Sequence, residues 1–122
     1  MAADDKVGIG LTHGLDGPES VLIASLTGVE ALRTDKQAVM WLTKDGVHVA
    51  TSGFAGQVEV LDAPVVAELH KEYTRLGGRF FACPVCVRTR KIDGAEFVEG
   101  AEVKGASFVY EFAAGGALTF NY

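Results

Sequence analysis

The sequence predicts a single α/β domain with a mostly parallel sheet of four to five strands, for two reasons. Short apolar runs of strand length, at residues 7–11, 38–42 and 79–82, alternate with segments of helical periodicity at 18–33 and 62–76. Such alternation implies right-handed crossovers between parallel strands, with helices covering both faces of the sheet. The carboxyl ends of the strands then share one edge, where ligands and reactive groups gather.

The first strand and helix follow from residues 7–33. Val7-Gly-Ile-Gly-Leu11 alternates large apolar residues with glycine, which predicts a buried strand whose bare face lets a helix pack closely. Pro18 and Glu19 suit a first helical turn. Apolar positions then continue at helical spacing, at Leu22, Leu26, Val29 and Leu32 or Arg33.

The middle of the chain supplies two more strands and one helix. Ala38 to Leu42 and Arg79 to Ala82 predict the second and third strands, and residues 47–61 predict a loop with a short helical turn near the rim of a site. Asp62 is predicted as an N-cap, with Pro64 in the first turn of a helix that ends at Gly77-Gly78. One apolar stripe marks this helix, at Val66, Leu69, Tyr73 and Leu76.

The last segment supports two structures. By propensity, residues 108–112 and 117–120 favour a β-hairpin. The alternative is a helix from about Glu102 to Ala114, a glycine cap at Gly115 or Gly116 and one last parallel strand. That helix would direct four residues inward, namely Gly105, Phe108, Val109 and Phe112.

Composition restricts the class of protein. With 122 residues there is room for one domain, covering 1–122. The net charge of −5 and the scattered cations oppose nucleic-acid binding. No secretory signal or membrane-spanning run is visible, so we expect a cytoplasmic protein that binds neither nucleic acid nor membrane. In that reducing setting, paired cysteines are expected to be reactive or metal-binding.

Both cysteines lie in Cys83-Pro-Val-Cys86, directly after a predicted strand and before the basic segment Arg88-Thr-Arg-Lys91. A cysteine at the first turn of a helix faces unpaired backbone N–H groups and a partial positive charge, which favour the reactive thiolate. The shared carboxyl edge of the sheet brings Thr12-His13 and Thr43-Lys44 to the same side as Cys83. The candidate site is therefore Cys83 flanked by these loops.

The histidines have two interpretations each. His13 is a candidate proton donor or acceptor near Cys83, or a loop residue bonded to backbone. His48 and His70 are expected in structural or solvent-facing positions. In Gly8-Ile-Gly10-Leu-Thr-His13 the third glycine of the dinucleotide fingerprint is missing, so no NAD, FAD or other cofactor is expected.

The Cys-Pro-Val-Cys motif has four interpretations. A thioredoxin-like dithiol fits the motif, but Pro18 and Pro64, the only other prolines, suit helix starts rather than an opposing cis-proline loop. A zinc site needs about four ligands, whereas the histidines lie in unrelated segments, so no metal is expected. In the third interpretation, both thiols are simply packed as small hydrophobic side chains. The fourth interpretation is a cysteine that carries sulfur as a persulfide.

Four segments, taken together and in order, resemble the DsrE/DsrF-like family, and they cover nearly the whole chain. They are residues 7–19, 39–47, 82–92 and 99–105, which include Gly-Ile-Gly-Leu-Thr-His13 and Ala82-Cys-Pro-Val-Cys86. The resemblance implies a three-layer α/β/α DsrE-like fold that assembles as homo-oligomers, usually trimers or hexamers. It also favours the helix and final strand over the hairpin in the last segment.

The resemblance implies a role for Cys83. Sulfur-relay members place an Arg-Gly pair seven and eight residues beyond the cysteine that accepts sulfur from a donor protein and passes it on. Arg90 matches this pair, Lys91 replaces its glycine, and Cys86 is additional. We therefore expect a sulfur carrier or sulfurtransferase in which Cys83 accepts the persulfide, Cys86 resolves it, and Arg88 or Arg90 stabilises the anion.

Two other functions use the same residues. The first is a non-enzymatic oligomeric binding protein, whose pocket at Thr12, His13, Thr43 and Cys83 holds a small ligand or a partner's tail. The second is thiol-disulfide exchange by Cys83 and Cys86 without sulfur transfer.

Overall fold

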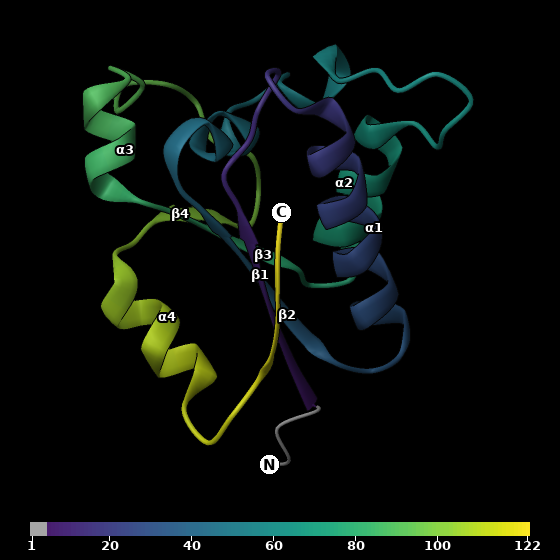
Figure 1. Ribbon diagram of the computed structural model, residues 1–122. Coiled ribbons are helices and arrows are strands. Elements are labelled where there is room, and N and C mark those ends of the chain that lie inside the picture. The colour runs from purple at the N-terminus through teal and green to yellow at the C-terminus, as the bar shows by residue number, and fades with distance from the viewer. Residues whose placement is uncertain (1–4) are drawn as a thin grey trace.

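The computed structural model describes residues 5–122 and contains five strands, four α-helices and two 3-10 segments (Figure 1). The strands are β1 (Lys6–Leu11), β2 (Gln37–Leu42), β3 (Arg79–Ala82), β4 (Ala101–Val103) and β5 (Leu118–Asn121). The helices are α1 (Pro18–Arg33), α2 (Val66–Arg75), α3 (Pro84–Thr89) and α4 (Ala106–Ala113). The 3-10 segments are η2 (Lys44–Ala50) and η3 (Ala55–Gln57). They supply the short helical turns predicted for the loop of residues 47–61, although η2 begins earlier, at Lys44.

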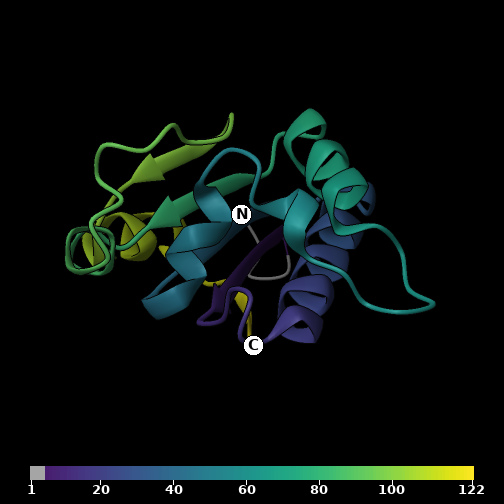
Figure 2. The same ribbon diagram turned by 90° about the horizontal axis from the view of Figure 1, so that it is seen from above.

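The strands form one sheet in the order β4-β3-β2-β1-β5, and every neighbouring pair is parallel. Helices α1 and α2 cover one face, while α3 and α4 lie on the other side (Figures 1 and 2). The predicted α/β class and parallel sheet are therefore confirmed. The loops after β1, β2 and β3 emerge at one edge, as the carboxyl-end rule requires.

The core lies between the sheet and the helices α1 and α2. Val7, Ile9 and Leu11 of β1 are buried there and pair in register with buried residues of β2. The largest fully buried side chain is Tyr73, whose ring packs 5.0 Å from Phe80 and whose hydroxyl donates a hydrogen bond to the backbone oxygen of Arg79. This packing fixes α2 against β3, the strand that leads into the cysteine motif.

The glycine face of β1 differs from the prediction. A Cβ atom on Gly8 would approach Thr119, and one on Gly10 would overlap Asn121, both on the neighbouring strand β5. No helix atom lies within 4 Å of either position. The prediction that a helix packs closely on this face was wrong, because the adjacent strand supplies the nearest side chains.

Helix α2 begins later than predicted. Its N-cap is Val65, and Asp62 lies in a turn with a φ of 60° rather than at a helix start. Pro64 disfavours helical backbone at Ala63, and Val65 has an extended backbone, so the helix begins at Val66. The predicted apolar stripe is confirmed where Val66 and Tyr73 are buried.

The C-terminal segment is a helix followed by a parallel strand, not a hairpin. Helix α4 ends at Ala113 and β5 pairs with β1, while residues 101–103 form β4 instead of the start of the helix. No residue of α4 is fully buried, and Phe108 is 41% exposed with the Lys104 ammonium 4.6 Å from its ring. Phe108 and Phe112 line a hollow together with Phe81 of the sheet, and the Lys104 ammonium lies near both the Phe108 and Phe81 rings, so Phe108 faces the sheet without being buried.

Candidate functional site

Cys83 joins β3 to α3 and is the N-cap of that helix. Its N–H donates to the backbone oxygen of Leu42 at 2.9 Å, and its own oxygen accepts the N–H of Val87 at 3.0 Å. Pro84 occupies the first helical position, where its missing N–H costs no hydrogen bond. The backbone of Cys83 is therefore held both by the sheet and by the helix, and its side chain is half-buried.

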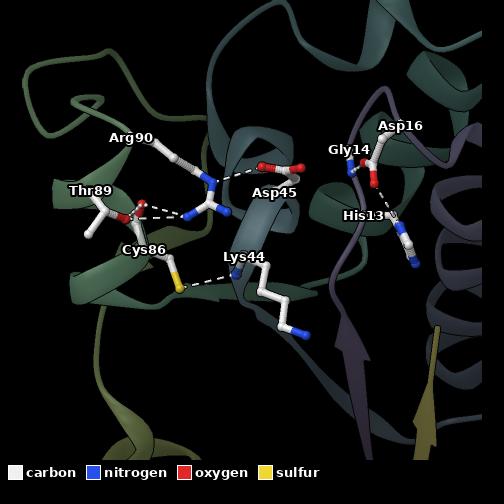
Figure 3. A network of polar contacts seen from close by, with 8 residues as sticks. All are labelled: His13, Gly14, Asp16, Lys44, Asp45, Cys86, Thr89 and Arg90. Carbon is white, nitrogen blue, oxygen red and sulfur yellow. Dashed lines mark hydrogen bonds and ion pairs between the residues drawn. The ribbon is translucent and has the colours of Figure 1, made fainter.

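Cys86 lies one helical turn beyond Cys83, with its side chain directed toward the loop that follows β2 (Figure 3). Its Sγ accepts a hydrogen bond from the backbone N–H of Lys44 at 3.1 Å. Lys44 has a φ of 53°, in the left-handed region, and its ammonium points away from the sulfur in Figure 3. Lys44 therefore acts on Cys86 through its backbone.

The two thiols differ in acidity. Partial burial raises the pKa of the Cys83 thiol, but hydrogen bonds from the backbone N–H and the thiol of Cys86 outweigh this effect. The backbone N–H of Val85 and the charge of Arg88 add to the lowering, so the pKa of Cys83 falls below its usual value. Burial raises the pKa of Cys86, the N–H of Lys44 lowers it, and the neighbouring Cys83 raises it again. The pKa of Cys83 is thus lowered and that of Cys86 raised, which favours Cys83 as the thiolate of the pair.

Arg90 binds an acidic residue that the sequence did not indicate. Its Nε donates to Asp45 Oδ1 at 2.8 Å, and its Nη1 lies 3.5 Å from the backbone oxygen of Cys86 (Figure 3). Asp45 follows Lys44 in η2, so this segment contacts α3 through both residues. The carboxyl-end rule that selected Thr43-Lys44 could have found Asp45, because it is the next residue after the same strand.

His13 and Thr12 reach the same edge of the sheet but not the cysteines. They follow β1, and β2 separates that strand from β3, which puts their backbones about 10 Å from Cys83 by normal strand spacing. His13 Nδ1 lies 3.0 Å from Asp16 Oδ2, and this hydrogen bond is the main reason that the pKa of Asp16 is lowered. Thr12 Oγ1 donates to the backbone oxygen of Tyr122.

Thr43 connects the ends of β1 and β2. Its N–H donates to the backbone oxygen of Leu11 at 3.1 Å, and its own oxygen accepts the N–H of Gly46 at 2.9 Å. A hollow of about 430 Å³ lies on this edge, and Asp16, Asp45 and His48 are among its lining residues. This hollow meets the cysteine site at Asp45, whose carboxylate also binds Arg90.

Helix α3 ends with backbone geometry that explains the glycine expected at position 91. The N–H groups of Lys91 and Ile92 donate to the oxygens of Arg88 and Val87, the pattern of a Schellman motif. Lys91 has a φ of 57°, which glycine adopts more readily than any residue with a side chain. The replacement of glycine by Lys91 therefore leaves the turn intact at a cost in stability.

Lys91→Gly is expected to stabilise the protein by about 1 kcal/mol, because it relieves the left-handed backbone strain. Urea unfolding measures this effect. The matched control is Lys71→Gly in α2, an exposed position inside a helix, which is expected to lose about 1 kcal/mol. Loss of stability in both variants would contradict the proposed strain at Lys91.

Two further classes of site find no support within residues 5–122. No group of three or more His, Cys, Asp or Glu side chains in this range is arranged to hold a metal ion. No helix in the same range is long and apolar enough to cross a membrane.

The sequence and the fold match known proteins. A model of the DsrE/DsrF-like family matches residues 5–120. The crystal structure of the YchN protein from E. coli superposes with a TM-score of 0.76 at 16% identity, covering 95% of this chain and 99% of that one. MTH1491 from Methanobacterium thermoautotrophicum, a protein of unknown function, gives a TM-score of 0.66 at 19% identity, with coverages of 98% and 100%.

BT1422 from Bacteroides thetaiotaomicron, a conserved protein of unknown function, gives a TM-score of 0.60 at 16% identity and covers 98% of both chains. No curated protein matches the sequence significantly. At these identities the structural likeness establishes a shared fold.

Proposed function

Because the chain belongs to the DsrE/DsrF-like family, we propose that it carries sulfur, with Cys83 as the residue that accepts a persulfide. The observation that carries this proposal is the position of Cys83, half-buried at the N-cap of α3 with its backbone held by both β3 and the helix. Hydrogen bonds from the Cys86 backbone and thiol, which exceed the opposing effect of burial, lower the pKa of Cys83 in this position. A thiolate is the nucleophile in sulfur transfer. A persulfide is more acidic than a thiol and is therefore anionic near neutral pH. The groups that stabilise the thiolate also favour the loaded form.

Loading conserves atoms and charge. The Cys83 thiolate attacks the outer sulfur of a donor persulfide, the sulfur–sulfur bond of the donor breaks, and the donor leaves as a thiolate. Cys83 then carries the transferred sulfur as its own persulfide. Arg88, whose charge already favours the Cys83 thiolate, is placed to favour the persulfide anion by the same attraction.

Release follows either of two balanced routes. An acceptor thiolate attacks the outer sulfur and leaves Cys83 as a thiolate, ready for another cycle. Alternatively, Cys86 loses its proton and attacks the inner sulfur, which forms a Cys83–Cys86 disulfide and expels hydrosulfide. An external dithiol must then reduce that disulfide, so this second route needs a reductant.

The direct test is mass spectrometry after incubation with a persulfide donor and removal of excess donor. Wild-type protein is expected to gain the mass of one sulfur atom on Cys83, and Cys83→Ser is expected to gain none. Cys86→Ser is the matched control, because it retains the acceptor, keeps a hydroxyl donor in place of the Cys86 thiol and removes the second route of release. An unmodified Cys83, under conditions that load a known sulfur carrier, would overturn the proposal.

Thiol-disulfide exchange is the second candidate, favoured by the hydrogen bond between the two thiols and by their unequal acidities. It requires a Cys83–Cys86 disulfide that forms between about −300 and −150 mV, the range of known dithiol oxidoreductases. A redox titration followed by mass spectrometry of the alkylated protein measures this. Absence of a disulfide over that range would exclude the exchange function and leave persulfide loading untouched.

A further inference from the structure

Two charged side chains, those of Arg90 and Asp45, lie close to Cys86 and to each other. Arg90 is the C-cap of α3, four residues after Cys86, and its guanidinium lies 3.5 Å from the backbone oxygen of Cys86. A free guanidinium there would attract a thiolate on Cys86. The charge of Arg90 is instead opposed by the carboxylate of Asp45, at 2.8 Å.

We propose that Asp45 is a positioning residue that selects which cysteine is ionised, by neutralising Arg90 and holding its guanidinium against η2. The carboxylate and the guanidinium form a bridge between the loop after β2 and helix α3. With Arg90 engaged, its attraction for a thiolate on Cys86 is weakened, which leaves Cys83 as the favoured thiolate of the pair. The chemical meaning of this selection rests on the proposed function, because the sulfur acceptor must be the ionised thiol.

The polar groups around Cys86 each favour or oppose its thiolate form. The N–H of Lys44 and the charge of Arg90 favour the Cys86 thiolate, whereas a thiolate on Cys83 opposes it. Asp45 acts on this balance through Arg90. Removal of its carboxylate therefore exposes Cys86 to an uncompensated cation, and ionised Cys86 no longer donates its proton to Cys83.

The electrostatic role and a purely structural role of Asp45 predict opposite results. If Asp45 only tethered η2, its loss would move the Lys44 N–H away from Cys86 Sγ and raise the pKa of Cys86. If Asp45 neutralises Arg90, its loss lowers the pKa of Cys86. The sign of the change thus separates the two roles without any sulfur donor.

The experiment is brief labelling of the reduced protein with a limiting amount of iodoacetamide between pH 6 and 9. Trypsin releases one peptide, residues 80–88, that contains both cysteines, and its fragmentation assigns the label to Cys83 or Cys86. Asp45→Asn is expected to lower the Cys83-to-Cys86 labelling ratio about tenfold, the effect of roughly one pKa unit. Asp45→Glu is expected to restore the ratio, and Glu72→Gln, which breaks an ion pair remote from the cysteines, to leave it unchanged.

Arg90→Gln tests the mechanism. If Asp45 acts through Arg90, adding Asp45→Asn to Arg90→Gln is expected to change the ratio no further, which a double-mutant cycle measures. An unchanged or higher ratio in Asp45→Asn, or an equal effect of Asp45→Asn in both backgrounds, would overturn the proposal. Because iodoacetamide labelling needs no sulfur donor, failure of persulfide loading would reject the sulfur-carrier function independently of this result.

Discussion

Gly46→Ala is expected to destabilise the protein by about 3 kcal/mol, the upper end of the usual cost of overpacking. A Cβ atom at this position would overlap the backbone oxygen of Leu11. That oxygen is fixed, because Leu11 ends β1 and the sheet holds β1 between β2 and β5. Segment η2 would therefore have to move, and with it the Lys44 N–H and the Asp45 carboxylate that contact α3.

Urea unfolding measures the stability, and the labelling ratio of the two cysteines measures the site. Gly94→Ala is the matched control, since a Cβ there meets no atom within 4 Å and the glycine does not have a left-handed φ. It is expected to change stability by less than about 0.5 kcal/mol. Equal stabilities for the two variants would show that the close approach of η2 to β1 is not rigid.

A second large effect is expected from pH, through His70. This side chain is buried, its Nε2 lies 3.0 Å from Ser25 Oγ, and the Ser25 hydroxyl donates to the backbone oxygen of Val21. The imidazole is therefore the donor to Ser25, and burial lowers the pKa of His70 to about 4. In the unfolded chain the pKa is about 6.5.

The direction of the pH effect on stability depends on whether the folded or the unfolded protein binds a proton at His70. Above pH 6.5 both states are neutral at His70, whereas between pH 6.5 and 4 the unfolded chain binds a proton that the folded protein excludes. Stability is therefore expected to fall by about 3 kcal/mol as the pH is lowered from 7.5 to 4, and this contribution levels off below pH 4. Urea unfolding at a series of pH values measures the loss.

His70→Gln isolates this contribution. Glutamine retains a donor for Ser25 and does not titrate, so the variant is expected to lose the His70 part of the pH dependence. The carboxyl groups of Asp16 and Glu72 titrate equally in both proteins, and subtraction of the two curves removes their effect. Identical curves for wild type and variant would contradict a neutral, buried His70.

Much of the fold could be predicted because its signals are local. Strand-length apolar runs and the helical spacing of Pro18–Arg33 are properties of neighbouring residues, and they predicted the right class and most elements, although β4 was missed. The predictions failed where contacts or backbone geometry outside the local apolar pattern decide the structure. Residues 62–65 adopt a turn and extended backbone before α2, and β5 supplies the nearest side chains to the glycine face of β1.

By itself the sequence determined that both sulfurs lie at the carboxyl end of a buried strand, since a strand run followed directly by Cys-Pro is sufficient for this. Only the tertiary structure decided which groups reach them. The order of strands places β2 between β3 and β1, so Lys44 and Asp45 contact α3 while His13 binds Asp16. The physical reason is that hydrogen bonds and ion pairs act over a few ångströms, and the arrangement of strands in space decides which residues come within that range.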